Sequence, residues 1–330
     1  MKKLISILVA LTLFAGVLTG CGTIGNSGDK LSIVTTIFPE YDWVKQILGE
    51  QSENADITLL LDNGVDLHNY QPTADDIVTI ADCDMFIYVG GHSDDWAEDV
   101  LAQAKNEDMV VINLFEVLGD AVKEEELVDG MEHEHEDEDH EHEDEEEHEH
   151  IHENDEHVWL SLRNAEIACN AICEKLCDLD PDNAETYTAN TESYCQKLSD
   201  LDVQYKSAVD TASVKTLLFG DRFPFRYLLD DYGIEYYAAF SGCSAESEAS
   251  FETIAFLAGK VDELGLSSVI KLKGSDGSIT QTIVDTSSAK NADILTMDSM
   301  QTTTTQDADN GTTYLAIMES NLQVLIDALK

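Results

Sequence analysis

The sequence predicts an α/β protein of two similar lobes joined by one long helix. Short apolar runs alternate with helical patterns in the first part of the chain, and the same alternation begins again after residue 213. This alternation is typical of parallel sheets covered by helices. Between the two parts, residues 183–212 form an amphipathic pattern without Pro or Gly. A helix of that length measures roughly 40 Å. One small lobe needs less, so we interpret this helix as a connector between two lobes.

The first twenty residues are typical of an export signal. Two lysines precede the apolar stretch Leu4–Leu18, which is too short to predict a membrane span. The stretch ends in Leu-Thr-Gly-Cys21, which resembles the bacterial lipobox. That resemblance implies cleavage before Cys21 and lipidation of its thiol, which would tether the exported chain to the outer face of the cell membrane. An uncleaved anchor helix is the alternative. Residues 21–30 are then a short flexible tether.

The N-terminal lobe is predicted over residues 31–182. Apolar, β-rich runs mark its strands, and prolines near the starts of two patterns favour helices there. We expect strands over 31–37, 56–61, 85–89 and 109–115, and helices over 39–48, 71–81, 96–104 and 162–179.

An acidic, His-rich segment interrupts this lobe over residues 124–156. It holds seven of the ten histidines, and no Lys or Arg occurs between 124 and 157. Such a segment cannot bury a core, so we expect a disordered loop. Imidazole suits Zn²⁺, and carboxylates concentrate the cation nearby, so the pattern favours metal collection over a merely solubilising insert. The collecting histidines would be His133, His135, His140, His142, His148, His150 and His152.

The C-terminal lobe is predicted over residues 213–330, after the connecting helix. Gly233 and Gly265 are placed to end two of its helices. We expect strands over 214–219, 234–240, 268–272 and 292–296, and helices over 224–232, 251–264, 279–289 and 314–329.

Charge limits the partners of the protein. The formal net charge is −49, and much of it lies outside the His-rich segment. Nucleic acid is therefore excluded as a partner, because phosphate recognition needs a basic face. A cation is the natural ligand of such a field.

The remaining six cysteines show no Cys-x-x-Cys pairing. Cys169, Cys173 and Cys177 are spaced by four, which places them on one helix face as small buried residues. A disulfide to Cys195 is the alternative in an exported protein, and spacing alone does not decide between the two.

Five candidate metal ligands follow predicted strands or the His-rich segment. In open α/β sheets, ligands bind outside the carboxyl ends of the strands. Two such edges that face each other would form a cleft with a site at its floor. The candidates are His68, His157, Asp221, Cys243 and Asp298.

Three segments carry a family resemblance. Residues 66–73 read Asp-Leu-His-Asn-Tyr-Gln-Pro-Thr, residues 157–165 read His-Val-Trp-Leu-Ser-Leu-Arg-Asn-Ala, and residues 296–299 read Thr-Met-Asp-Ser. Together they resemble the ligand segments of the metal-binding lipoproteins that feed zinc and manganese ABC importers. The resemblance implies two (β/α)4-like lobes with a buried metal site between them. It also implies a monomeric receptor that captures the ion outside the membrane and hands it to a permease powered by a cytoplasmic ATPase.

The third ligand position departs from the family pattern. Arg222 stands where family members place a His or Glu, and a guanidinium has no lone pair with which to coordinate. Asp221, Cys243 and Glu246 are the possible substitutes. Our hypothesis is a site of His68, His157 and Asp298, completed by Cys243 or, next in order, Asp221. Arg222 would then pair with a carboxylate, Asp221 or Asp298.

Zinc is favoured over manganese because imidazole and thiolate suit Zn²⁺, whereas Mn²⁺ prefers oxygen ligands. The alternatives are a manganese receptor of the same family, a secreted zinc-dependent hydrolase and a surface zinc buffer. A hydrolase needs an open coordination position and a general base. The sequence contains no His-Glu-x-x-His run and no serine nucleophile elbow.

Overall fold

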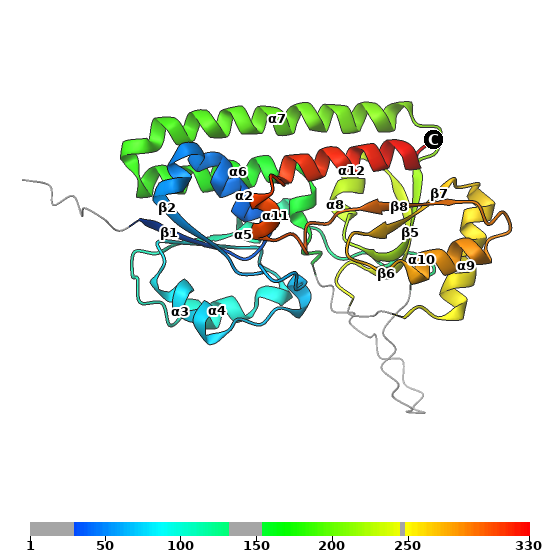
Figure 1. Cartoon of the computed structure of the whole chain (residues 1–330), viewed down its shortest axis with the longest axis horizontal. Helices are drawn as coiled ribbons and strands as arrows, with labels where there is room; N and C mark the ends of the chain where they lie inside the picture. Colours follow the sequence, from blue (N-terminus) through cyan, green and yellow to red (C-terminus); the bar gives the residue numbers. More distant parts are fainter. Residues whose placement is uncertain (1–29, 132–153, 245–247) are drawn as a thin grey trace, which may run out of the picture.

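Two four-stranded parallel sheets form the centres of two lobes, and one long helix runs along both of them (Figure 1). The computed structural model describes residues 30–131, 154–244 and 248–330. The predicted fold class is confirmed. The export signal, Cys21, the seven loop histidines and Glu246 lie outside the described residues. Within the described part, no helix has the length and apolar character needed to cross a membrane.

The N-terminal sheet has the strand order β2-β1-β3-β4. Its central strand β1 pairs in parallel with both β2 and β3, so the carboxyl ends of the strands share one edge. The bounds are β1 Leu31–Thr35, β2 Ala55–Leu59, β3 Met85–Tyr88 and β4 Val110–Asn113, with helices α2 Phe38–Leu48, α3 Ala74–Asp82, α4 Trp96–Leu101 and α5 Leu114–Leu118.

The C-terminal sheet repeats this arrangement with the order β6-β5-β7-β8. Helices α8 and α9 end at the predicted glycines, Gly233 and Gly265, which adopt the left-handed conformation. The bounds are β5 Thr216–Phe223, β6 Glu235–Ser241, β7 Ser268–Leu272 and β8 Asp293–Met297, with helices α8 Arg226–Tyr232, α9 Phe251–Leu264, α10 Ser278–Thr286, α11 Thr305–Asp309 and α12 Tyr314–Ala328.

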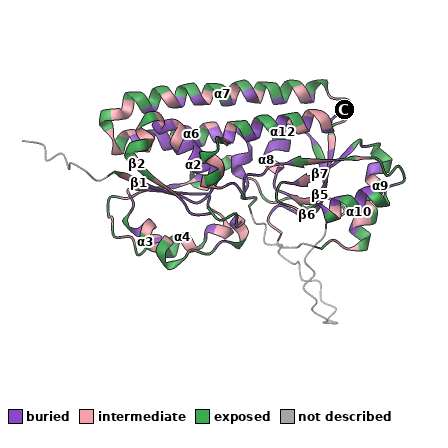
Figure 2. Ribbon diagram, viewed as in Figure 1, coloured by how far each residue is buried: buried purple, intermediate pink, exposed green. Residues whose placement is uncertain are grey.

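Three helices form a layer over both sheets (Figure 1). They are α6 Leu162–Leu179, α7 Ala184–Thr211 and α12. Helix α7 is exposed along its outer side and buried where it faces the other two helices (Figure 2). The buried Tyr205 hydroxyl donates to the Met318 carbonyl at 2.6 Å and ties α7 to α12.

The lobes also share a core. One continuous cluster of buried apolar side chains extends from the N-terminal sheet through α6 and α7 to α8 and α12. A smaller cluster lies between the C-terminal sheet and helices α9 and α10. The Trp159 indole donates to the Ser299 carbonyl at 2.9 Å, and the Tyr314 hydroxyl donates to the Trp159 carbonyl at 2.7 Å. Packing as well as the long helix therefore fixes how the lobes sit together.

Candidate metal centre

Three of the five predicted ligands converge at the junction of the lobes. His68 lies in a short 3₁₀ turn of the N-terminal lobe, Leu67–Asn69, and His157 directly precedes another, Val158–Leu160. Cys243 follows β6 of the C-terminal lobe. One ligand atom from each side chain lies within 4.8 Å of the other two. The structure thus brings together two imidazoles and one thiol from distant parts of the chain.

The same kind of local turn holds both histidines. In Asp66-Leu67-His68 the Asp66 Oδ1 accepts the backbone N–H of His68 at 3.1 Å. In Asp155-Glu156-His157 the Asp155 Oδ1 accepts the backbone N–H of His157 at 2.9 Å. An aspartate that bonds to the backbone two residues ahead forms an Asx turn, which fixes the direction of the following side chain.

Carboxylates also orient the two rings. Nδ1 of His157 lies 3.0 Å from Asp155 Oδ1, and Nδ1 of His68 lies 3.1 Å from Glu156 Oε2 and 2.9 Å from Ser93 Oγ. A carboxylate beside Nδ1 favours the tautomer with the proton on Nδ1, and in that tautomer the lone pair on Nε2 is available to a metal ion. The arrangement is the carboxylate–histidine pair found behind many metal ligands.

The two Nε2 atoms face each other, 3.2 Å apart. Two nitrogens bound to a tetrahedral Zn²⁺ at 2.0–2.1 Å are separated by roughly 3.3 Å. The rings therefore already hold the spacing that a shared metal ion requires. Gly242 permits this approach, because a Cβ at that position would lie 3.0 Å from His157 Cε1 and 2.8 Å from the Phe223 carbonyl oxygen.

The electrostatic setting favours a cation. Burial and the neighbouring carboxylates Glu125, Asp155 and Glu156 raise the pKa of the Cys243 thiol. Burial also opposes ionisation of Glu156, but hydrogen bonds from His68 and Ser93 hold the pKa of Glu156 below its ordinary value. A divalent cation next to the thiol would reverse the first shift and release its proton, as metals do with coordinating thiols.

The structure does not bring Asp298 into this cluster. One oxygen of its carboxylate accepts from the Lys273 ammonium at 2.8 Å, and the other accepts the backbone N–H of Met300 at 2.8 Å. Asp221 is also elsewhere, because its oxygens accept the backbone N–H groups of Arg222 at 3.0 Å and Leu272 at 3.3 Å. Both carboxylates are engaged in local bonds that the sequence pattern does not reveal.

Arg222 pairs with neither Asp221 nor Asp298, which corrects our expectation. Its Nη2 donates to Asp66 Oδ2 at 2.6 Å, across the lobe junction. Asp66 Oδ1 also accepts from Gln301 Nε2 at 3.1 Å, and it lies 3.9 Å from His68 Nε2. Although burial works against ionisation, Arg222 holds the pKa of Asp66 below its ordinary value. Sequence reasoning missed Asp66, although the repeated Asp-x-His spacing could have indicated it.

The segment before the His-rich stretch and the segment after it meet beside this cluster. Glu124 and Asn154 form an antiparallel bridge. Glu125 Oε1 accepts the backbone N–H of Cys243 at 3.0 Å, and the Tyr227 hydroxyl donates to the Asp155 carbonyl at 2.7 Å. We predicted a disordered loop over 124–156, but its two ends, 124–131 and 154–156, are ordered and bonded to residues beside the cluster.

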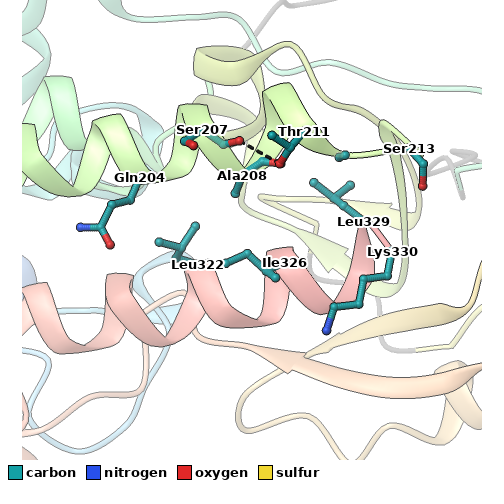
Figure 3. Close-up of a pocket in the computed structure, with 10 residues that line it drawn as sticks. Gln204, Ser207, Ala208, Thr211, Ser213, Leu322, Ile326, Leu329 and Lys330 are labelled. Carbon is teal, nitrogen blue, oxygen red and sulfur yellow. Dashed lines mark hydrogen bonds between the residues drawn. The ribbon is translucent and has the colours of Figure 1, made fainter.

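Two of the hollows in the described part of the chain help to locate the site. A polar cavity of 420 Å³ borders the cluster and is lined by Asp66, Arg222, Ser244, Lys273 and Gln301 among others. A larger hollow of 590 Å³ lies between the C-terminal ends of α7 and α12 (Figure 3). No His, Cys, Asp or Glu lines the larger hollow, whereas the group of side chains in the described residues that could hold a metal ion lies at the lobe junction.

Two α/β lobes with two imidazoles and a thiol gathered at their junction have the architecture of a two-lobed metal-binding receptor. The model of one protein family, described as zinc-uptake complex component A, periplasmic, matches residues 33–328. The chain belongs to this family of solute-binding receptors.

Relatives and solved structures agree with the assignment. The high-affinity zinc uptake system protein ZnuA of Bacillus subtilis is 31% identical over 308 residues, which cover 93% of this chain and 90% of that protein. The zinc-binding lipoprotein AdcA of Streptococcus pneumoniae is 31% identical over 98% of this chain, but the chain spans only 60% of AdcA. The Zn(II)-bound ZnuA-like domain of that AdcA is 26% identical, with a TM-score of 0.68 over 91% of this chain and 99% of the domain. The metal-dependent lipoprotein YcdH of Bacillus subtilis is 26% identical, with a TM-score of 0.71 over 91% of this chain and 100% of YcdH.

Proposed function

We propose that this protein is an extracytoplasmic zinc receptor that binds one Zn²⁺ tightly between its lobes and delivers it to an ABC import permease. The observation that carries the proposal is the pair of Nε2 atoms 3.2 Å apart, with the Cys243 thiol beside them. Carboxylates lie beside Nδ1 of both rings, which favours the tautomers whose Nε2 lone pairs face the shared position. The zinc-binding relatives support this choice of ion.

The proposed ligands are His68, His157 and Cys243. Two neutral imidazoles and one thiolate leave a bound Zn²⁺ with one positive charge, so an oxygen ligand completes the tetrahedral set. Asp66 is the first carboxylate to consider, because its Oδ1 lies 3.9 Å from His68 Nε2. Asp298 and Asp221 come after it, because neither contacts either imidazole, whereas Asp66 does.

The ligand set also supports zinc over manganese. Thiolate and imidazole suit Zn²⁺, whereas Mn²⁺ favours carboxylate, carbonyl and water oxygens. The cluster supplies two nitrogens and a sulfur, so it lacks the oxygen ligands that Mn²⁺ prefers. Zinc is the transported substrate in this proposal, and the protein is a carrier of the ion rather than an enzyme.

Export and delivery complete the proposal. Lipidation of Cys21 would anchor the receptor at the outer face of the cell membrane, beside the permease and its cytoplasmic ATPase. The seven histidines of residues 133–152 would collect zinc for the site between the lobes. On one side of this stretch Glu125 bonds to Cys243, and Glu124 pairs with Asn154, three residues before His157. The family assignment supports a partner of the ABC importer class.

Cobalt substitution tests the ligand set directly. Co²⁺ bound to a thiolate gives an intense charge-transfer band, and we expect this band in the native protein and in Cys177→Ser, a matched control outside the cluster. The band should vanish in Cys243→Ser, and zinc affinity should fall by about tenfold or more because a thiolate ligand is lost. A Zn²⁺ against Mn²⁺ titration on the same samples should show preference for zinc. An unchanged band in Cys243→Ser, or tight zinc binding that survives His68→Ala, would refute the proposed site.

A further inference from the structure

Four of the six cysteines in the described residues lie on one helical hairpin, far along the chain from Cys243. Cys169, Cys173 and Cys177 are on α6, and Cys195 is on α7. All four are free thiols in the structure. The sequence alone leaves open which thiol of α6, if any, would pair with Cys195.

The register of the hairpin selects Cys169. Helices α6 and α7 run antiparallel, and the 3₁₀ turn Pro181–Asn183 joins them. Cys169 and Cys195 each lie thirteen residues from Asp182, the middle residue of that turn. In an antiparallel helix pair, residues at equal distances from the turn lie at the same height. Cys173 and Cys177 are closer to the turn and have no cysteine opposite them on α7.

Contacts between the two helices agree with this register. The Cys195 Sγ lies 3.7 Å from Asn170 Nδ2 and 4.0 Å from the Glu166 carbonyl oxygen, and these two atoms flank Cys169 on α6. Nearer the turn, the Cys177 Sγ lies 3.9 Å from the Thr188 hydroxyl of α7. The helices therefore keep one register from the turn to the height of Cys195.

We propose that Cys169 and Cys195 form a disulfide that cross-links α6 to α7 when the exported chain meets a disulfide donor. One thiolate attacks the donor disulfide, forms a mixed disulfide and releases one donor thiol. The second protein thiol then loses its proton, displaces the remaining donor half as a thiolate and closes the bond. Two protein thiols are oxidised, and one donor disulfide is reduced to two thiols.

The two thiols are suited to different steps. Cys195 is partly exposed, and the hydrogen bond from Cys169 lowers its pKa despite some burial, so Cys195 is the thiol that attacks the donor. Cys169 is fully buried, and burial raises its pKa, so an external donor does not reach it. Cys169 then attacks only the Cys195 sulfur of the mixed disulfide.

The cross-link would stabilise the scaffold without touching the metal ligands. It would close the α6–α7 hairpin, and α6 begins at Leu162, shortly after His157. Disulfides stabilise mainly by restricting the unfolded chain. For a protein of this size we expect the melting temperature to rise by roughly 5–10 °C on oxidation.

Oxidation of the zinc-loaded full chain by glutathione disulfide tests the proposal. The reduced protein is incubated with the oxidant, and free thiols are then counted after unfolding, together with the intact mass and the melting temperature. We expect the native protein and Cys173→Ala to lose two thiols, without a glutathione adduct, and to melt higher. Cys195→Ala should keep its thiols and its melting temperature. The proposal is overturned if the native protein keeps all its thiols, if glutathione stays attached to Cys195, or if Cys195→Ala still loses two thiols through Cys173 and Cys177.

Discussion

The orientation of each histidine that we propose as a ligand depends on an aspartate two residues before it. Asp66 and Asp155 both accept the backbone N–H of their histidine, and Asp155 also accepts from the ring of His157. One short side chain therefore sets the backbone turn and the ring direction together. Because the bond is local, Asp-x-His is a pattern that can be sought directly in a sequence.

Asp155→Asn tests this positioning role. The amide oxygen still accepts the backbone N–H of His157, so we expect the fold and melting temperature of the metal-free protein to change little. The ring loses its charged acceptor, and zinc affinity should fall by about 10- to 100-fold. Competition with a chelator measures the affinity, and Asp178→Asn, an exposed change elsewhere, is the control. Equal affinities for Asp155→Asn and the native protein would contradict the role.

Arg222→Met tests how the charge of Asp66 is balanced. Loss of the guanidinium leaves a largely buried carboxylate without its ion-pair partner, so the free energy of unfolding without zinc should fall by about 1–3 kcal/mol. The freed carboxylate lies close to the metal position, so zinc should raise the melting temperature more in the variant than in the native protein. Thermal melts with and without zinc measure both effects. An equal zinc-induced shift in the two proteins would count against Asp66 as the oxygen ligand.

The pH dependence of this stability difference follows from the lowered pKa of Asp66. A carboxyl whose pKa is lowered in the folded state stabilises the fold above its ordinary pKa, and that contribution is lost as the pH falls through the folded value. The difference in the free energy of unfolding between the native protein and Arg222→Met should therefore have its full value at neutral pH. This difference should disappear only at pH values below the ordinary pKa range of aspartate.

At the scale of elements, capping residues explain which predictions were accurate. The bounds of α6 and α9 were predicted correctly, because Ser161 and Ser250 cap their starts and Gly265 ends α9. Helices α5 and α11 were not predicted, since five residues are too few to show a helical period. Strand β5 was predicted to end at Phe219 but continues to Phe223, past an irregularity in its pairing with β6.

The anchored ends of the His-rich stretch predict the outcome of its deletion. Removing residues 132–153 and closing the gap should leave one tight zinc site, because Glu124, Glu125, Asn154 and Asp155 keep their bonds beside the ligands. Several weak zinc equivalents should disappear, since unanchored ligands must be ordered on binding. Calorimetric titration of both proteins counts the two classes of site. Loss of the tight site on deletion, with tight binding retained in His68→Ala, would show that the His-rich stretch is the true receptor.

At the scale of the whole molecule, sequence reasoning reached the two lobes, the connecting helix and three residues of the cluster. Alternating patterns reveal strand order along the chain, and parallel sheets place strand ends at one edge, so His68, His157 and Cys243 could be selected. The partner of Arg222 could not be selected, because Asp66 lies 156 residues away in the other lobe. Asp298 was assigned by resemblance, and its ion pair with Lys273 depends on how β7 and β8 lie side by side. Contacts that depend on tertiary packing remained beyond a single sequence.

The placement of Cys243 on a different lobe from His68 has a consequence for unloading. Each imidazole has a carboxylate beside its Nδ1, whereas the thiol follows the end of β6 in the C-terminal lobe. If the lobes separated, the bond between the Cys243 sulfur and a bound ion would be strained, because Cys243 and His68 belong to different lobes. The ion would then be held by fewer ligands. Ligand groups on the permease could then bind the ion directly, so its release would not require complete dissociation into water.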